Sequence, residues 1–474
     1  MKPTLNFLSA DELQTIHESA LDILETEGMQ LPSERVLNVL RKAGCPVDEN
    51  NIVKFPREIV NDAISKTPKR DEAVLYARDE KYDLKPSEVA PALAAMVEAT
   101  QVIDIDSGKK RPATMDDLVK MTGMLQELEN VAIASPPVTP QDVPLDITDW
   151  YTWAASLSYT TKHITGPGTG SRCVKDVVKM ASLAAGGEEE FLKRPFLSFW
   201  VLTRPPLQVD SLTLDALVEA SEFGCPLIIS SGPILGTTSP VTIAGTCAQA
   251  HAEILSCLTI AQLVNPGVTV IYTSFARGMD MKTGNVSMAG PEFAILKGCM
   301  GALGRMLDLP TRMPGMLRDA KILDAQAGYE TGTTGLICGF CADFMDGMQF
   351  DMDIVVDYAD FVYADECMAQ VRRIVRDLVV DEKTLARKVI AETGHGGNFL
   401  KAGHTLSNFR KEIWQPKIFE RRMWGGWEKD GALDIREKAL AKAREMVLAG
   451  PPSALPDDVR ESIYAIARAA KAGH

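Results

Sequence analysis

The chain has 474 residues and a formal net charge of −14, and 46% of its residues are hydrophobic. This length suits one large barrel with extensions better than a single small domain. The acidic balance argues against nucleic-acid binding, because few cations remain to neutralise a run of phosphates. No apolar run reaches the roughly 20 residues that span a bilayer, so no membrane segment is expected.

The first part of the chain carries the pattern of two helices followed by a small sheet. Ser9 is followed three residues later by Glu12, which is the spacing of a capping box, and Gly28 and Gly44 stand where the two helices should end. Short strand-like segments come next, in IVKF, AVLYARD and QVIDIDSGKK. We therefore predict an N-terminal extension of helices and a small sheet over residues 1–110.

From about residue 112, helical segments alternate with short apolar runs bounded by Gly or Pro. The runs are VAIAS, KHITG, FLSFWV, CPLIISSG, VTVIYTS, PTRMPG and CADFM. Such alternation indicates a parallel α/β sheet, and about seven repeats favour a closed (β/α)8 TIM barrel over an open doubly wound sheet. The barrel is predicted to fill residues 111–370, and the charged, helical residues 371–474 are predicted to form a C-terminal cap.

In a TIM barrel, the chemistry stands at the carboxyl ends of the strands. Aromatic side chains recur at or near the predicted strand ends, namely Trp200, Tyr272, Phe275, Tyr329 and Phe344. Each of them taken singly is more typical of a core residue. Several at one mouth would instead suit a quaternary ammonium group, held by cation–π contacts of about 0.5–2 kcal/mol each.

The stretch KILDAQAGYETG, residues 321–332, places polar side chains among Ala and Gly. If it is helical, Gln326, Tyr329 and Glu330 share one face, and Asp324 stands where a carboxylate caps a helix. From this segment alone, a capped surface helix and a functional site are equally open.

Acid–base and metal-binding patterns are scarce elsewhere. His163 lies in a predicted strand and is interpreted as a core histidine with a structural partner. Cys338 and Cys341 form CGFC, which resembles half a zinc site or a redox motif, but no further ligand follows at short spacing. We expect buried thiols behind a barrel strand and no metal site. The nine scattered cysteines indicate reduced thiols in the cytoplasm.

Several segments together resemble the trimethylamine methyltransferase family. They are LSADELQTIHESALDILETEG, ISSGPILGTTSPVTIAG, AQLVNPG, DAQAGYE and HTLSNFRKEIWQPKIFERR, and the resemblance covers nearly the whole chain. It implies a TIM barrel that transfers a methyl group to the Co(I) of a separate corrinoid protein. The trimethylamine enzymes of the family carry pyrrolysine after DAQAGYE, whereas this chain has only standard residues in LICGFCADFMDGM. It therefore resembles the members that demethylate quaternary amines such as glycine betaine.

The resemblance and the strand ends together give a set of predicted site residues. A quaternary nitrogen leaves as a neutral amine, so no general acid is required, and the protein's task is to position the substrate and exclude water. The predicted catalytic residues are Asp324 and Glu330 for negative charge and Gln326 for a hydrogen bond. The predicted substrate-binding residues are Tyr329, Trp200, Tyr272, Phe275 and Phe344 as ring faces and Arg312 as the grip on a substrate carboxylate, with Arg204 and Arg277 as substitutes.

Several alternatives stay open at this point. Glycine betaine is the first choice because it is the smallest betaine, and carnitine, γ-butyrobetaine and proline betaine remain alternatives. No tightly bound cofactor is expected, because no DxHxxG cobalamin pattern occurs and the corrinoid would come with the partner protein. A homo-oligomer is expected by analogy. The rival functions are a zinc-dependent methyltransferase acting on a thiol, supported only by CGFC, and a betaine-binding or corrinoid-docking protein without catalysis.

Overall fold

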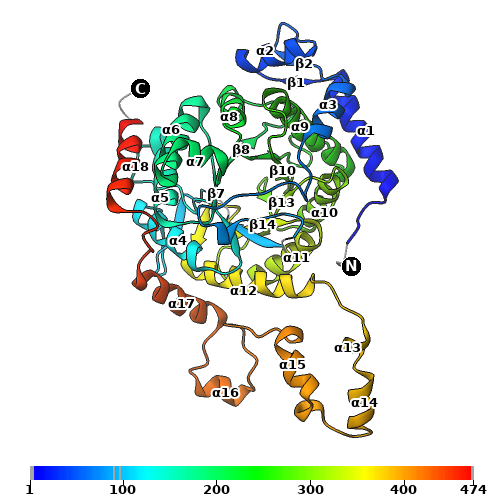
Figure 1. Cartoon of the computed structure of the whole chain (residues 1–474), viewed down its shortest axis with the longest axis vertical. Helices are drawn as coiled ribbons and strands as arrows, with labels where there is room; N and C mark the ends of the chain where they lie inside the picture. The colour runs from blue at the N-terminus through cyan, green and yellow to red at the C-terminus, as the bar shows by residue number, and fades with distance from the viewer. Residues whose placement is uncertain (1–4, 89–90, 96–97, 471–474) are drawn as a thin grey trace.

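The computed structural model describes residues 5–88, 91–95 and 98–470. Its centre is a closed barrel of eight parallel strands in the order β10-β13-β14-β3-β6-β7-β8-β9, surrounded by helices (Figure 1). The predicted TIM barrel is confirmed. The strands are β3 (Ala92–Ala95), β6 (Val131–Ala134), β7 (His163–Gly166), β8 (Leu197–Leu202), β9 (Leu227–Ser231), β10 (Val270–Ser274), β13 (Thr311–Leu317) and β14 (Phe344–Gln349).

The helices between the strands pack around the barrel, so most strands are buried on both faces, as parallel sheets require. One of these helices, α9, is the only one in the described ranges that is long and apolar enough to cross a bilayer, and 89% of its apolar window is buried inside the protein. The surrounding helices are α4 (Met115–Glu127), α5 (Thr148–Tyr159), α6 (Gly170–Ala185), α7 (Glu188–Lys193), α8 (Ser211–Glu222), α9 (Ile243–Val264), α10 (Pro291–Met306), α11 (Ala325–Cys341) and α12 (Tyr358–Ile374), with a 3-10 turn at Leu145–Ile147.

The barrel begins earlier than the boundary predicted at residue 111. Its first strand, β3, lies in the run ALAA and pairs in parallel with β14 on one side and β6 on the other. Alanine has low strand propensity, so this segment carries no strand signal of its own. A small three-stranded sheet lies beyond the carboxyl ends of two barrel strands. Its strands β4 (Gln101–Ile103) and β5 (Lys110–Pro112) follow β3, and β15 (Val355–Asp357) follows β14 and pairs with β4.

The N-terminal extension packs on the outside of the barrel. Its capping box at Ser9 and Glu12 is formed, and Gly44 ends the second helix in the left-handed conformation, with φ of 93°. The first and third helices pack against α9. The elements are α1 (Ala10–Thr26), β1 (Met29–Gln30), α2 (Glu34–Ala43), β2 (Ile52–Val53), α3 (Arg57–Lys66) and a 3-10 turn at Glu80–Tyr82.

The C-terminal region is helical as predicted, but only its last two helices cover the barrel. α17 packs on α12, and α18 packs on α5 and α6. The preceding segment projects away from the barrel (Figure 1), and we call residues 377–413 the arm. The elements are α13 (Glu382–Leu385), α14 (Arg387–Thr393), a 3-10 turn (Phe399–Lys401), α15 (Gly403–Glu412), α16 (Trp424–Lys429), α17 (Ile435–Ala449) and α18 (Asp457–Ala470).

Candidate active site

A cavity of about 410 Å³ opens at the carboxyl ends of β8, β9 and β10, where TIM barrels bind their substrates. This volume lies in the lower range of small-molecule sites. The cavity is lined by Glu98, Pro167, Trp200, Leu202, Thr203, Arg204, Pro205, Ser230, Gly232, Phe275, Arg277 and Asp353.

Two of the predicted aromatic residues meet in this cavity. Trp200 lies in the second half of β8, Phe275 directly follows β10, and their ring centroids lie 6.1 Å apart in an edge-to-face arrangement. Gly232 allows the two walls to approach, because a Cβ atom there would lie 3.2 Å from the Cβ atom of Phe275. Trp200 and Phe275 therefore form one apolar corner of the cavity.

Two carboxylates enter the cavity from strained backbone. Glu98 follows β3 with φ of 83°, and Asp353 follows β14 with φ of 72°. Asp351 and Met352 also have positive φ, so three consecutive residues of this loop adopt a conformation that side chains disfavour. Such strain persists only where the surrounding structure imposes it, and it is concentrated at functional sites.

Both carboxylates have raised pKa values. Burial raises the pKa of Asp353 to about 7, an effect that Arg277 opposes and the nearby Asp346 and Asp319 reinforce. The side chain of Glu98 is reached by solvent through the cavity. The surrounding protein nevertheless desolvates its carboxylate, which raises the pKa of Glu98 to about 7, and the charge of Asp149 raises it further. A cation bound between these groups would favour their ionised forms.

The cavity also holds two arginines, Arg204 and Arg277. Burial lowers the pKa of Arg277, and Asp353 opposes this effect. The Nε–H group of Arg277 is buried and has no hydrogen-bond partner among the described residues. A buried donor without a partner is costly, so this group can bind an incoming anion. The cavity thus offers negative charge and ring faces beside guanidinium groups.

The structure contradicts the predicted place of Arg312. This residue is the second of β13 and therefore stands at the amino end of the strand, inside the barrel. It is fully buried, donates from Nε to Asp346 Oδ1 at 2.6 Å, and stacks on the ring of Trp200 at 4.4 Å. Arg312 does not line the cavity, and the two substitutes named from the sequence, Arg204 and Arg277, do.

Tyr272 and Phe344 also lie outside the cavity, contrary to prediction. The hydroxyl group of Tyr272 is hydrogen-bonded to His251 Nδ1 at 2.8 Å, on the side of β10 that faces α9. Phe344 is the first residue of β14 and is fully buried in the apolar cluster that also contains Trp200 and Phe275. Both are core residues, as single aromatics usually are.

The polar cluster of residues 324–330 forms the capped helix rather than the cavity wall. Asp324 accepts a hydrogen bond from the backbone of Ala327 at 3.0 Å and so caps α11. Tyr329 points into solvent, with 77% of its surface exposed. The predicted role of these two residues in the cavity is not supported by their positions.

Glu330 and Gln326 hold a loop at the barrel mouth instead of facing the cavity. Glu330 Oε2 accepts from the backbone N–H groups of Asp319 and Ala320 at 3.0 and 3.1 Å, and its Oε1 accepts from Gln326 Nε2 at 2.7 Å. Asp319 in turn accepts from the backbone of Met288 at 2.8 Å. The cluster therefore acts through the loop that follows β13.

Two supporting residues were missed from the sequence. Glu253 of α9 is fully buried and accepts from Thr203 Oγ1 at 2.6 Å and Ser231 Oγ at 2.7 Å, and also from Leu207 N and Gln249 Nε2. Lys297 donates to the carbonyl groups of Ser274 and Ala276, each at 2.6 Å, on both sides of Phe275. A single charged residue inside a long apolar helix was the signal that could have found Glu253.

The expectation that His163 and the two cysteines of CGFC are buried side chains is confirmed. His163 is buried with ring nitrogens 2.6 Å from Tyr76 O and 2.9 Å from Ser198 Oγ, and burial lowers its pKa to about 4. Cys338 and Cys341 are buried on α11, and their sulfur atoms face the carbonyl groups of Pro314 and Lys297. In the described part of the chain, no three His, Cys, Asp or Glu side chains are grouped to hold a metal ion.

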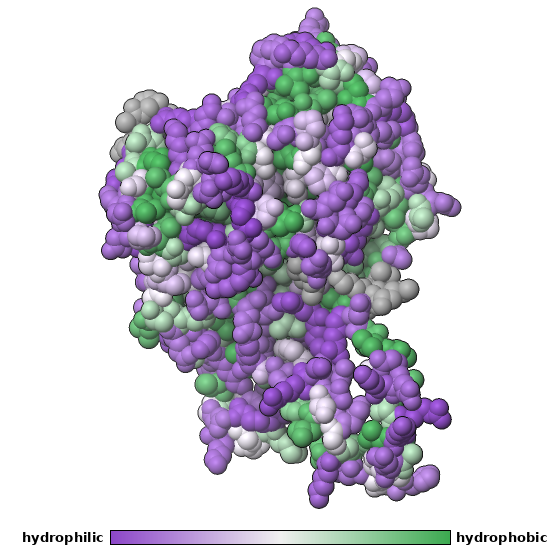
Figure 2. Space-filling model, viewed as in Figure 1, coloured by the Kyte–Doolittle hydropathy of each residue, from purple (hydrophilic) through white to green (hydrophobic). Residues whose placement is uncertain are grey.

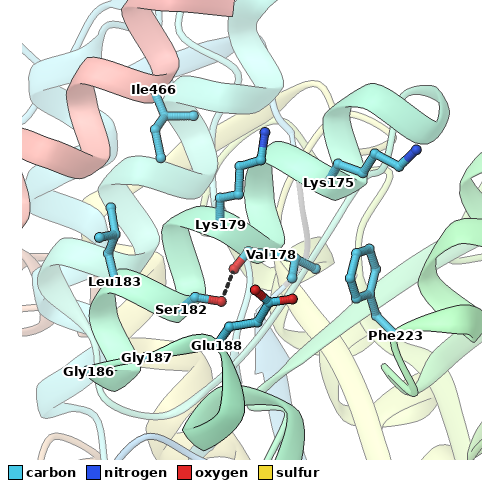
Figure 3. Close-up of a pocket in the computed structure, with 10 residues that line it drawn as sticks. All are labelled: Lys175, Val178, Lys179, Ser182, Leu183, Gly186, Gly187, Glu188, Phe223 and Ile466. Carbon is cyan, nitrogen blue, oxygen red and sulfur yellow. Dashed lines mark hydrogen bonds between the residues drawn. The ribbon is translucent and has the colours of Figure 1, made fainter.

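A second cavity, of about 710 Å³, lies on the outer wall of the barrel between α6, α7 and α18 (Figure 3). Its lysines are already paired, Lys175 with Glu219 at 3.5 Å and Lys179 with Asp176 at 3.3 Å. Ser182 donates to the carbonyl group of its own helix, as Figure 3 shows. The remaining polar side chain is that of Glu188, and a single carboxylate does not define a ligand site, so no site is assigned there.

Residues 1–473 match the family described as trimethylamine methyltransferase (MTTB). The chain belongs to this family. It is 29% identical over 461 residues to "Trimethylamine methyltransferase MttB" of Desulfitobacterium hafniense (strain DSM 10664 / DCB-2), covering 97% of this chain and 92% of that protein. It is also 29% identical over 472 residues to "Glycine betaine methyltransferase" of D. hafniense (strain Y51), covering 98% and 96%.

Among solved structures, the monomethylamine methyltransferase MtmB of Methanosarcina barkeri matches with a TM-score of 0.47 and 13% identity, over 92% of this chain and 93% of that chain. The match of residues 1–473 to the family confirms the membership inferred from the sequence, and the protein is an enzyme of the methyltransferase class.

The buried amine of Lys297 makes the stability of the methyltransferase depend on pH. Burial lowers the pKa of Lys297 to about 7, well below its ordinary value of 10.5. Between these values the unfolded chain holds a proton that the native protein lacks, so the free energy of unfolding rises with pH, by at most about 1.4 kcal/mol per unit. Chemical denaturation at pH 7.5 and 9.5 should show this gain in the wild type.

The variant Lys297→Met is the control for this prediction, because it keeps the length of the side chain and removes the titration. Groups far from Lys297 titrate alike in both proteins, so the difference between the two pH profiles reports Lys297 together with its effect on the nearby Cys247, Cys338 and Asp346. Parallel profiles would contradict the lowered pKa.

Proposed function

We propose that this methyltransferase demethylates a quaternary amine that carries a carboxylate, with glycine betaine as the first candidate, and transfers the methyl group to the Co(I) of a corrinoid on a separate protein. The observation that carries the proposal is the composition of the mouth cavity. Carboxylates and ring faces stand beside two arginines in about 410 Å³, which matches a small zwitterion.

The relatives support this substrate class without deciding the substrate. Two proteins at the same 29% identity are named for trimethylamine and for glycine betaine. The chain contains only standard residues. The resemblance associates pyrrolysine with trimethylamine, so its absence favours the quaternary substrate.

The ammonium head of the substrate would lie at Trp200 and Phe275, facing Glu98 and Asp353. Two ring faces would contribute about 0.5–2 kcal/mol each, and ionisation of the carboxylates would add charge attraction. The positive charge on nitrogen fades as the methyl group leaves, so a complete aromatic cage would stabilise the substrate more than the transition state. A corner of two rings is consistent with this limit.

The carboxylate of the substrate would lie at Arg277, with Arg204 as the second donor. A guanidinium group binds a carboxylate through two parallel hydrogen bonds, and Nε of Arg277 is free to donate. This end of the substrate keeps its charge throughout the reaction. It can therefore supply affinity that is equal in the substrate and the transition state.

The reaction itself needs no proton transfer. The C–N bond breaks with its electron pair kept by nitrogen, which leaves as a neutral tertiary amine, and Co(I) supplies the electron pair of the new bond to carbon. The residues of this chain bind the substrate, align its N–CH3 bond with the opening of the cavity and exclude water.

The size of the cavity favours an acceptor that approaches from outside. A volume of about 410 Å³ holds a small amine but not a corrin ring as well, so the corrinoid would be presented by a partner protein at the mouth. All nine cysteines are buried and free. Reduced thiols and Co(I) both suit a reducing compartment, and we place the enzyme in the cytoplasm.

The substrate class is tested by measuring the conversion of Co(I) to methylated Co(III) by absorbance. The purified enzyme is supplied with a reduced corrinoid protein, or with free cob(I)alamin, and one amine at a time. We expect turnover with at least one of glycine betaine, carnitine, γ-butyrobetaine and proline betaine, and slower turnover with tetramethylammonium, which lacks a carboxylate. Activity with trimethylamine alone would disprove the proposal, and calorimetric betaine binding without turnover would indicate a binding protein.

The carboxylates predict how activity depends on pH. Because Glu98 and Asp353 have pKa values raised to about 7, they lose their charge below that pH, and kcat/KM for the betaine should fall as the pH drops from 8 to 6. Asp353→Asn should raise KM by about tenfold or more, since a charge-assisted contact contributes about 1.5–3 kcal/mol. Asp324→Asn, which alters a carboxylate outside the cavity, is the matched control and should leave KM unchanged.

The position of Arg277 predicts that its substitution changes KM much more than kcat. Arg277→Lys keeps the charge and removes the two-bond geometry, so KM for the betaine should rise at least tenfold, or about 1.4 kcal/mol, while kcat stays within threefold. The KM for tetramethylammonium should not change. Arg172→Lys on the outer helix α6 is the control. Equal effects on both amines would mean that Arg277 does not bind the carboxylate.

A further inference from the structure

The projecting arm, residues 377–413, has apolar residues on its surface, as Figure 2 shows. Its six Lys and Arg and five Asp and Glu leave a net charge of only +1. Nothing in the described ranges shows what covers these residues, and the charge selects no partner. No partner is therefore assigned to the arm.

A more definite feature is the loop that carries Asp353 into the mouth cavity. Residues 351–353 all have positive φ, of 52°, 56° and 72°. The base of the loop is closed by Phe350 and Val355, whose backbone groups form two hydrogen bonds of 2.8 and 3.2 Å. These bonds fix where the loop starts and ends but not the strained residues between them, so other contacts must hold Asp353 in the cavity.

The strained residues are hydrogen-bonded to a second segment, residues 318–320, which follows β13. The backbone N–H group of Asp351 donates to the carbonyl group of Ala320 at 3.0 Å. The backbone N–H group of Met352 donates to the carbonyl group of Arg318 at 3.2 Å. The two residues that precede the cavity carboxylate are therefore bound to this segment.

The N–H groups of the same segment are bound by Glu330 of α11. Glu330 Oε2 accepts from Asp319 N at 3.0 Å and from Ala320 N at 3.1 Å. Ala320 thus binds Glu330 through its N–H group and Asp351 through its carbonyl group. Hydrogen bonds to an ionised carboxylate are stronger than those to a neutral acceptor. A continuous chain of hydrogen bonds therefore links Glu330 to the loop of the cavity carboxylate.

Glu330 is itself held in place by its own helix. Only 9% of its surface is exposed, and Gln326 Nε2, one helical turn away, donates to its Oε1 at 2.7 Å. Asp324 caps the start of the helix by accepting from Ala327 N. The polar residues at both ends of DAQAGYE thus order the helix and direct the carboxylate of Glu330 toward the segment after β13.

The first residue of that segment is fixed independently of Glu330. The buried side chain of Arg318 pairs with Asp360 of α12 at 2.6 Å and donates from Nε to Thr331 Oγ1 at 2.7 Å. It also stacks on the ring of Phe350 at 4.5 Å. Removing the carboxylate of Glu330 should therefore free the end of the segment that binds the strained loop without unfolding the whole segment.

We propose that Glu330 is a positioning residue for Asp353. It holds residues 319 and 320, and through them the strained loop, so that the carboxylate of Asp353 faces the ammonium group of the substrate. This role rests on the proposed function, in which Asp353 attracts that group. Glu330 does not touch the substrate. An amide at this position can still accept the two backbone hydrogen bonds, whereas an alanine cannot.

The first test compares KM with kcat for glycine betaine, or for the fastest betaine of the amine panel. Glu330→Ala should raise KM at least tenfold and change kcat less than threefold, because it weakens the binding of the ammonium group. Glu330→Gln keeps an acceptor and should stay within threefold of the wild-type KM. Equal losses in both variants would mean that the charge itself is needed and would overturn the proposal.

The control for this test is Thr334→Val on the same helix. The hydroxyl group of Thr334 donates to the carbonyl group of Gly315 within β13, so the variant removes a buried hydrogen bond of α11 that does not reach the strained loop. It should lower the melting temperature and leave KM unchanged. If Glu330→Ala behaves like this control, its role is only structural and the proposal is wrong.

A double-mutant cycle tests whether Glu330 acts through Asp353. In the Asp353→Asn protein, the contact that Glu330 supports is already lost. Adding Glu330→Ala should then raise KM by less than a further threefold, instead of the tenfold effect in the wild type, because coupled residues are not additive. Effects that multiply in the double variant would contradict the coupling.

Hydrogen exchange tests the chain of contacts without any substrate. In Glu330→Ala, the amides of Asp351 and Met352 should exchange at least tenfold faster than in the wild type, because their acceptors are no longer held, while the amides of β14 stay protected. Unchanged exchange at both residues would overturn the proposal even in an enzyme that demethylates a betaine. Faster exchange in an enzyme that demethylates no betaine would support the positioning and contradict only the proposed function.

Discussion

The wall of the mouth cavity depends on one buried carboxylate, that of Glu253. Removing a carboxylate from water is costly unless its oxygens are satisfied, and here four donors from three segments converge on it. Burial raises the pKa of Glu253, while these hydrogen bonds oppose the rise. Because the donors include side chains that follow β8 and end β9, the relative position of the two strand ends is set from α9, behind the barrel. Lys297 does the same for β10 from α10, so the backbone flanking Phe275 is also fixed from outside.

The overall fold could be predicted from the sequence because most barrel strands are apolar runs between helices with clear stop signals. The exception, β3, is instructive: a strand of four residues rich in Ala is defined by its neighbours β14 and β6, not by its own propensity. The same limit applies to Arg312. Its place in an apolar strand was correct, but only the register shows that it lies at the amino end, where Asp346 neutralises it.

The kinds of group in the candidate site, namely aromatic rings, carboxylates and arginines, could be predicted from the sequence better than the residues that supply them. Trp200 and Phe275 stand at strand ends, and a sequence pattern finds them. Glu98 and Asp353 lie in loops whose course depends on positive φ angles at side-chain-bearing residues, and no propensity predicts such a course. The DAQAGYE segment misled because only one of its polar residues, Glu330, is buried, and it binds the backbone of the preceding loop, whereas Tyr329 points into solvent. A conspicuous motif can hold a loop in place and still touch no ligand.

The contact between the first helix and α9 has a consequence for how the protein is made. His17 Nδ1 lies 2.9 Å from His251 Nε2, across a sequence separation of 234 residues. The apolar side of α1, with Ala20, Leu21 and Leu24, is buried in the finished protein, and its main packing partner is α9, which is synthesised much later. At 5–20 residues per second, this wait on the ribosome lasts roughly ten to fifty seconds. During that time the nascent N-terminus exposes part of the apolar face of α1. Exposed apolar surface of this kind is what chaperones bind.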